Sequence, residues 1–296
     1  MSAVDRGTVL VANLDQERLV RRSGTFGHVG QFFFVDIDAQ SRACGNVDMS
    51  TAYWHEFIGY VVFPEVAEID VIDGGHLEDR DFMHQVYTKA APDYSGRVTV
   101  PTLWDKKKET IASNESAEII RMFNSAFDGL KGVRTDLDFY PGELQEEIDT
   151  VNARVYDTVN NGVYKAGFAT AQDKYEEAYN ALFDSLDWLE ERLSSQRYLV
   201  GGRLTEADWR LFTTLIRFDA VYYSHFKCNR QRISDFPALS AYVRDLYQVP
   251  GVAKTVDIDQ IKRHYYVSQR TINPTQIVPV GPELDFDSPH GRESLS

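Results

Sequence analysis

The residues of this 296-residue chain that could do chemistry are two cysteines, a Glu-Ser pair and some of its 16 tyrosines. A cysteine attacks as its thiolate, which a nearby helix N-terminus favours by lowering the pKa. The spacing of Cys44 and Cys228 fits no zinc pattern, and two cysteines cannot build a disulfide framework. We therefore expect no metal, and a compartment that keeps thiols reduced.

The Glu115-Ser116 pair lies where the sequence predicts the start of a helix. The unpaired N–H groups and partial positive charge of a helix N-terminus favour a bound carboxylate. A simple N-cap with an acid in the first turn explains the same pair equally well. The residues alone leave both interpretations open.

Size and charge limit the classes of function. The length allows two compact domains. The formal net charge of −14 weighs against nucleic acid, which needs clustered cations facing phosphates. The short basic run Lys106-Lys107-Lys108 is expected to be a solvated turn between two strands. Apolar runs are too short to span a bilayer, and the first residues make a poor secretory signal, so we expect a cytoplasmic protein without membrane contact.

The first part of the chain mixes strand and helix signals, as expected of a thioredoxin-like domain over residues 1–128. Short apolar runs predict buried strands, and capped segments that end near proline or glycine predict helices. The expected strands cover 31–37, 68–72 and 97–103, and the expected helices cover 49–62 and 119–127.

The second part of the chain has a helical period. Residues 129–145 are expected to form a linker, and 146–296 an all-helical domain with an irregular tail from Asn273. Steps of three and four join an apolar stripe of Tyr175, Tyr179, Leu182, Leu186, Leu189 and Leu193. Thr205 and Asp208 have the spacing of a capping box that opens another helix.

Nine segments give this chain a family resemblance. Together they resemble the glutathionyl-hydroquinone reductases, the Xi class of glutathione transferases, from about Tyr87 to Arg292. The segments are DYSGRVTVP (93–101), LWDKK (103–107), NESAEIIR (114–121), NNGVYKAGFA (160–169), LTEAD (204–208), RFD (217–219), HFKC (225–228), KRHYY (262–266) and INPT (272–275). The resemblance implies the glutathione-transferase fold, a homodimer, a small aromatic substrate, and glutathione or another small thiol as co-substrate.

The resemblance also implies roles for particular residues. Val100, before Pro101, would offer its backbone to the thiol ligand across a cis peptide bond, which proline makes accessible. Glu115 and Ser116 would hold the ammonium and carboxylate of the γ-glutamyl group. Tyr164, Tyr222 and Tyr265 match the tyrosines that line the aromatic-substrate site, where neutral phenols can donate hydrogen bonds to a developing oxyanion.

The chain departs from the family at the nucleophile. The family carries its catalytic cysteine in an Ala-Cys-Pro-Trp-Ala sequence, which is absent here, and its tryptophan after the second strand is replaced near Gly74-Gly75-His76. One alignment places Cys44 at the nucleophile position. Another places it near Ser50, whose hydroxyl would activate a bound thiol without an enzyme thiolate.

Three functional hypotheses follow from this reading. The first is a thiol-dependent reductase of thiol-conjugated hydroquinones, with Cys44 as the nucleophile. The second is a thiol transferase or lyase without a catalytic cysteine, acting on a quinone-like or halogenated aromatic. The third is a non-catalytic dimeric binding protein.

Overall fold

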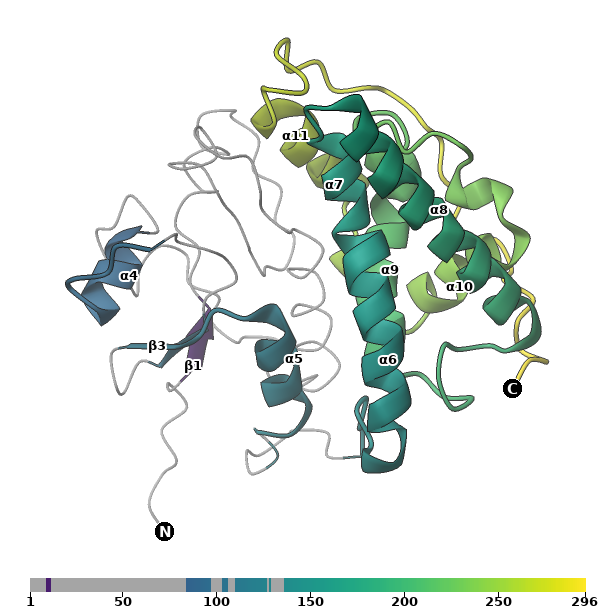
Figure 1. Ribbon diagram of the computed structural model, residues 1–296. Coiled ribbons are helices and arrows are strands. Elements are labelled where there is room, and N and C mark those ends of the chain that lie inside the picture. Colours follow the sequence, from purple (N-terminus) through teal and green to yellow (C-terminus); the bar gives the residue numbers. More distant parts are fainter. Residues whose placement is uncertain (1–8, 12–83, 97–102, 106–109, 127, 129–135) are drawn as a thin grey trace. The chain divides into compact units, whose positions relative to one another are not determined.

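The structure of the chain is a computed structural model, and it describes residues 9–11, 84–96, 103–105, 110–126, 128 and 136–296 (Figure 1). The chain divides into two compact units, 1–136 and 137–296, whose boundary falls inside the stretch expected as a linker. The expected strands at 31–37 and 68–72 and the expected helix at 49–62 lie outside the described residues.

The first unit contains a three-stranded antiparallel sheet in the order β1-β2-β3. Its strands are β1 (Val9–Val11), β2 (Leu103–Asp105) and β3 (Thr110–Ser113). Leu10 pairs with Trp104, and Asp105 pairs with Thr110. The sequence analysis assigned no strand to residues 9–11. The lysine run joins β2 to β3, as expected, although its own residues are not described.

Two helices of the first unit are described, α4 (His84–Ala90) and α5 (Ser116–Ser125). The order β2-β3-α5 matches the strand–strand–helix half of the predicted domain. The predicted bounds were wrong in detail. The helix expected to begin at Glu115-Ser116 and to continue over 119–127 has Glu115 as its N-cap and Ser116 as its first residue, as expected, but it ends at Ser125. Of the strand expected at 97–103, only Leu103 is described, and it opens β2.

The second unit is entirely helical in its regular elements (Figure 1). Its α-helices are α6 (Gln145–Val155), α7 (Gly162–Gly167), α8 (Gln172–Ser195), α9 (Glu206–Arg217), α10 (Pro237–Tyr247) and α11 (Ile258–Ser268). Short 3-10 turns are η1 (Gly142–Leu144), η4 (Ile233–Asp235) and η5 (Val252–Thr255). Two π-helical turns, η2 (Tyr156–Asn160) and η3 (Phe218–Tyr222), extend α6 and α9.

Helix α8, which carries the predicted apolar stripe, packs against α7 and α10. Its four leucines, from Leu182 to Leu193, are fully buried. The two tyrosines at its amino end, Tyr175 and Tyr179, are half-buried. The helical period was therefore read correctly, and the stripe forms the core of this unit.

The predicted capping box at the start of α9 is present. The Asp208 carboxylate accepts hydrogen bonds from the backbone N–H of Thr205 at 2.8 Å and from its hydroxyl at 2.9 Å. It also accepts from the Leu199 N–H and the Tyr242 hydroxyl, each at 2.8 Å. Burial raises the pKa of Asp208 to about 6 despite these donors. The cap therefore also ties α10 to the loop before α9.

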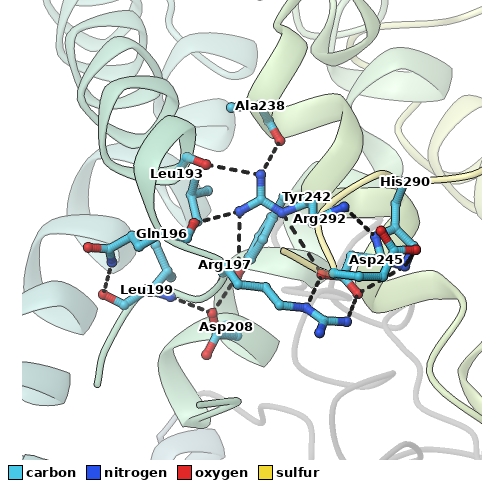
Figure 2. A network of polar contacts seen from close by, with 11 residues as sticks. Leu193, Gln196, Arg197, Leu199, Asp208, Ala238, Tyr242, Asp245, His290 and Arg292 are labelled. Atoms are coloured by element: carbon cyan, nitrogen blue, oxygen red, sulfur yellow. Dashed lines mark hydrogen bonds and ion pairs between the residues drawn. The ribbon is translucent and has the colours of Figure 1, made fainter. Parts of the chain in front are cut away.

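The irregular tail after Asn273 is fastened to the helices by Arg292, whose side chain is 3% exposed. Figure 2 shows its guanidinium among the backbone oxygens of Leu193, Gln196, Arg197 and Ala238, to which it donates. Leu193 lies in the last turn of α8, where carbonyl groups have no partner within the helix, and Gln196 and Arg197 follow directly after it, whereas Ala238 lies in the first turn of α10. Next to Arg292, Arg197 donates two 2.8 Å hydrogen bonds to Asp245 of α10.

Among the residues that the structure describes, none of the helices combines the length and the apolar character that crossing a bilayer requires.

Candidate functional site

Three phenol groups meet in the second unit, although their residues are far apart in sequence. Tyr164 lies on α7, Tyr222 ends the π-helical turn η3, and Tyr265 lies on α11. The Tyr265 hydroxyl oxygen is 2.6 Å from that of Tyr164 and 2.8 Å from that of Tyr222. Tyr265 is thus the centre of a hydrogen-bonded chain of three phenols, which we call the phenol cluster. These are the three tyrosines singled out in the sequence.

Burial differs along the phenol cluster. Tyr222 and Tyr265 are fully buried, and Tyr164 is half-buried. Desolvation, and next the neighbouring Tyr265, raise the pKa of Tyr222 well above its ordinary value near 10. Tyr222 therefore keeps its proton at neutral pH. Neutral phenols can donate hydrogen bonds to an oxygen on which negative charge develops.

The two π-helical turns help to position these tyrosines. In η3 the Tyr223 N–H donates to the backbone carbonyl oxygen of Phe218, five residues earlier, at 2.9 Å. In η2 the Asn161 N–H donates in the same way to the backbone carbonyl oxygen of Tyr156 at 2.9 Å. Such a turn inserts a residue and rotates the side chains after it. Tyr222 ends one of these turns, and Tyr164 follows the other by four residues.

Asn160, at the end of η2, joins the helices that carry these two tyrosines. Its side-chain amide donates to the Arg210 oxygen at 2.9 Å and to the Thr214 hydroxyl at 2.6 Å, both on α9. Sequence reasoning missed this contact. The only signal was the Asn160-Asn161 pair inside an otherwise helical pattern.

Polar groups near the cluster are hydrogen-bonded to one another in pairs. His225 Nε2 lies 2.8 Å from Gln269 Oε1, and the hydroxyls of Ser224 and Tyr266 are 2.5 Å apart. Burial lowers the pKa of His225 and of His264 to about 4, so both rings are neutral at pH 7. Burial raises the pKa of the free Cys228 thiol. A thiol in that state is a poor nucleophile.

In the first unit, the predicted Glu115-Ser116 pair lies at the start of α5. Glu115 has extended backbone angles, φ −99° and ψ 114°, at the N-cap position, yet its side chain makes no capping hydrogen bond. The Ser113 hydroxyl takes that role, because it accepts from the Glu115 N–H at 3.1 Å and donates to Glu118 at 2.8 Å. Glu115 is exposed and Ser116 is half-buried. Capping by Ser113 leaves both side chains available to a ligand.

Three of the expected site residues lie outside the described part of the chain: Cys44, Ser50 and Val100. The choice between Cys44 and Ser50 as the thiol-activating residue therefore stays a prediction, as does the cis bond before Pro101. Within the described residues, no group of three or more His, Cys, Asp or Glu side chains is arranged to hold a metal ion.

Comparison with known sequences finds one matching family and several relatives. The family described as "Glutathione S-transferase, C-terminal domain" matches residues 172–245. The glutathionyl-hydroquinone reductase YqjG of Escherichia coli (strain K12) is 58% identical over 220 residues, which cover 74% of this chain and 66% of that protein. The glutathionyl-hydroquinone reductase PcpF of Sphingobium chlorophenolicum is 52% identical over 237 residues, which cover 80% of this chain and 74% of that protein.

Solved structures agree with these relatives. The glutathione-bound structure of YqjG, a glutathione transferase homolog from Escherichia coli K-12, superposes with a TM-score of 0.77 at 49% identity, over 83% of this chain and 85% of that one. The Xi-class transferase from Natrialba magadii gives a TM-score of 0.78 at 43% identity, over 83% and 80% of the two chains. The predicted fold class, a thioredoxin-like domain followed by a helical domain, is confirmed by these structures.

Proposed function

The chain belongs to the glutathionyl-hydroquinone reductases, the Xi class of glutathione transferases, and on that premise we propose that it reductively removes glutathione from glutathionyl-hydroquinones. A second glutathione, or a related thiol, serves as co-substrate. In the balanced reaction, one glutathionyl-hydroquinone and one thiol give one hydroquinone and one disulfide. The thiol sulfur is oxidised, and the ring carbon gains the hydrogen that replaces sulfur.

The observation that carries this proposal is the phenol cluster. When sulfur is removed from the keto tautomer of the substrate, its bonding electrons pass to the ring, and the ring oxygen becomes an enolate. The linked hydroxyls of Tyr164, Tyr222 and Tyr265 supply neutral donors for that charge. Tyr164 is the most exposed of the three, so it is the phenol assigned to contact the substrate oxygen.

The thiol chemistry is assigned to the first unit. Cys44 as thiolate attacks the substrate sulfur and forms a mixed disulfide, which the second thiol resolves by exchange. Glu115 and Ser116 bind the γ-glutamyl ammonium and carboxylate, and the backbone of Val100 binds the thiol ligand. Exposure of Glu115 and the capping of α5 by Ser113 support this assignment. Ser50 is the alternative thiol-activating residue.

The test is a product balance with the purified full chain. Incubation of a glutathionyl-hydroquinone with glutathione is expected to yield free hydroquinone and oxidised glutathione in equal amounts. Accumulation of a thioether from a quinone and glutathione, without its consumption, would instead identify a transferase. Absence of turnover, together with absence of heat on calorimetric titration with several thiols, would identify a binding protein.

We also propose that the chain works in the cytoplasm as a homodimer, as the family resemblance implies. Light scattering coupled to size-exclusion chromatography checks the assembly. A mass near twice the chain's 33.8 kDa supports the dimer, and a mass near 33.8 kDa contradicts it.

A further inference from the structure

One buried phenylalanine contacts every ring of the phenol cluster. Phe226 is fully buried, and its ring centroid lies 5.2 Å from that of Tyr164, 5.4 Å from Tyr222 and 5.9 Å from Tyr265. Its plane is inclined by only 16° to Tyr222 and stands at 79° to Tyr265. These stacked and edge-to-face arrangements are the favoured geometries of aromatic pairs.

Gly167, at the end of α7, leaves the space that the Phe226 ring occupies. A Cβ atom built on Gly167 would lie 2.3 Å from both Cγ and Cδ1 of Phe226, and 2.8 Å from its Cβ. No side chain fits at such distances, so the ring would have to move. Helix α7 also carries Tyr164, so Phe226 fixes the distance between that tyrosine and the segment after η3.

The turn that carries Phe226 is itself rigidly held. The Cys228 backbone N–H donates to the backbone carbonyl oxygen of Tyr222 at 3.0 Å, which brings the chain back to the end of η3. Lys227 has a φ of 62°, in the left-handed region that non-glycine residues seldom adopt. Its carbonyl oxygen accepts a 2.7 Å hydrogen bond from the Tyr175 hydroxyl of α8. The ring therefore has little freedom to follow a displaced phenol.

We propose that Phe226 is a positioning residue for the phenol cluster and that Gly167 exists to admit its ring. The role rests on the proposed function, because positioning matters for catalysis only if the phenols act on the substrate. Phe226 touches no reacting atom. It sets the angles and spacing of the three phenols, so that their hydroxyls stay linked, with Tyr164 at the more exposed end of the chain, before substrate arrives.

The first test removes the Phe226 ring in one variant and displaces it in another. Phe226→Leu removes the flat surface, and Gly167→Ala pushes the ring away. Each is expected to lower kcat for a glutathionyl-hydroquinone by about 10- to 100-fold, with the KM for glutathione unchanged, because small misplacements of reacting groups have effects of this size. The double variant is expected to be at least as slow as the slower single variant, because leucine keeps the Cβ and Cγ atoms that the alanine methyl would meet at 2.8 and 2.3 Å.

Two matched controls separate positioning from general packing. Gly162→Ala makes the same change on the same helix, where the new Cβ meets Leu182 at 3.7 Å and the Asp157 backbone oxygen at 3.9 Å, both ordinary contact distances. Phe212→Leu removes a buried ring whose aromatic contact is with Trp209, outside the cluster. Both controls are expected to keep kcat within about twofold, because neither alters the geometry of the reacting groups. Equal losses in the test and control variants would overturn the proposal.

A second readout does not depend on turnover. Protein labelled with ¹³C at the tyrosine Cζ reports the hydrogen bonding of each phenol by NMR, and single Tyr→Phe variants assign the signals. Phe226→Leu and Gly167→Ala are expected to shift the signals of all three cluster tyrosines, and the controls to leave them in place. Shifted signals in a protein without reductase activity would keep the positioning role and remove the proposed function. Unshifted signals and an unchanged kcat in an active protein would remove the positioning role.

Discussion

The phenol cluster and the start of α5 are two polar regions built in opposite ways. In the phenol cluster, two of the three tyrosines are fully buried, and their hydroxyls already bond to one another at 2.6 and 2.8 Å. At the start of α5, the Glu115 side chain is exposed, and the capping hydrogen bonds belong to Ser113. The hydroxyls of the phenol cluster bond to one another, whereas the Glu115 side chain at the start of α5 is left available to a ligand.

The difference matches the task assigned to each region. A group that stabilises a developing charge acts best when its donors are fixed beforehand, because no free energy is then spent on reorientation during the reaction. A group that captures the charged end of a soluble thiol must remain accessible and exchange water for ligand. Substitutions in the cluster should therefore change kcat, and those at α5 should change KM.

The largest effect is expected at Cys44, the residue proposed as the nucleophile. Cys44→Ser should lower reductase turnover by about 10³-fold or more, because a hydroxyl neither forms nor resolves the mixed disulfide. Steady-state assays with a glutathionyl-hydroquinone measure it. Cys228→Ala is the control, since burial keeps that thiol protonated, and it should retain turnover. If Cys44→Ser stays active while Ser50→Ala fails, the nucleophile assignment moves to a bound thiol activated by Ser50.

Removal of the central hydroxyl should break the cluster next. Tyr265→Phe deletes the oxygen that both other phenols contact, and kcat should fall by about 10²-fold, as for loss of an oxyanion donor. The KM for glutathione should stay constant. Tyr266→Phe, one residue away, loses only its contact with Ser224 and should keep kcat within about threefold. A similar loss in both variants would mean that the cluster has no special role.

A substitution at the start of α5 should have a smaller effect, and it should change KM and not kcat. Glu115→Gln removes the charge assigned to the thiol's ammonium group, and KM for glutathione should rise by about tenfold with kcat unchanged. Unfolding by urea should show no loss of stability, because this side chain makes no capping bond. Ser113→Ala should do the reverse. It should cost about 1 kcal/mol of stability through the lost cap and leave KM near the wild-type value.

The smallest effect concerns pH and the packing beside the cluster. His225 has a folded-state pKa of about 4, below the ordinary value near 6.5, so the unfolded chain binds its proton first as pH falls. Stability should therefore decline from pH 6.5 toward pH 4. The His225→Gln variant should show a slope shallower by about one proton in urea unfolding at a series of pH values. An identical slope would mean that His225 titrates normally in the folded protein.

Local rules in the sequence predicted a good part of this protein. The stripe from Leu182 to Leu193 and the capping box at Thr205 depend on residues three or four apart on one helix, so their geometry follows from spacing alone. The same holds for the start of a helix at Glu115-Ser116, although that helix ends at Ser125, two residues before the predicted end.

Contacts between distant segments could not be predicted in this way. The π-helical turns η2 and η3 have no sequence period of their own, and each changes which face the residues after it present. The amide of Asn160 and the guanidinium of Arg292 find backbone oxygens far along the chain, and spacing carries no information about such partners.

The sequence by itself determined which residues belong to the phenol cluster, through motifs around Tyr164, Tyr222 and Tyr265 that match a known family. Tertiary structure alone decided that Tyr265 links the other two and that the ring of Phe226 lies against all three. The physical reason is that hydrogen bonds and ring contacts depend on distances of a few ångströms between helices. Only the packing of α7, η3 and α11 fixes those distances.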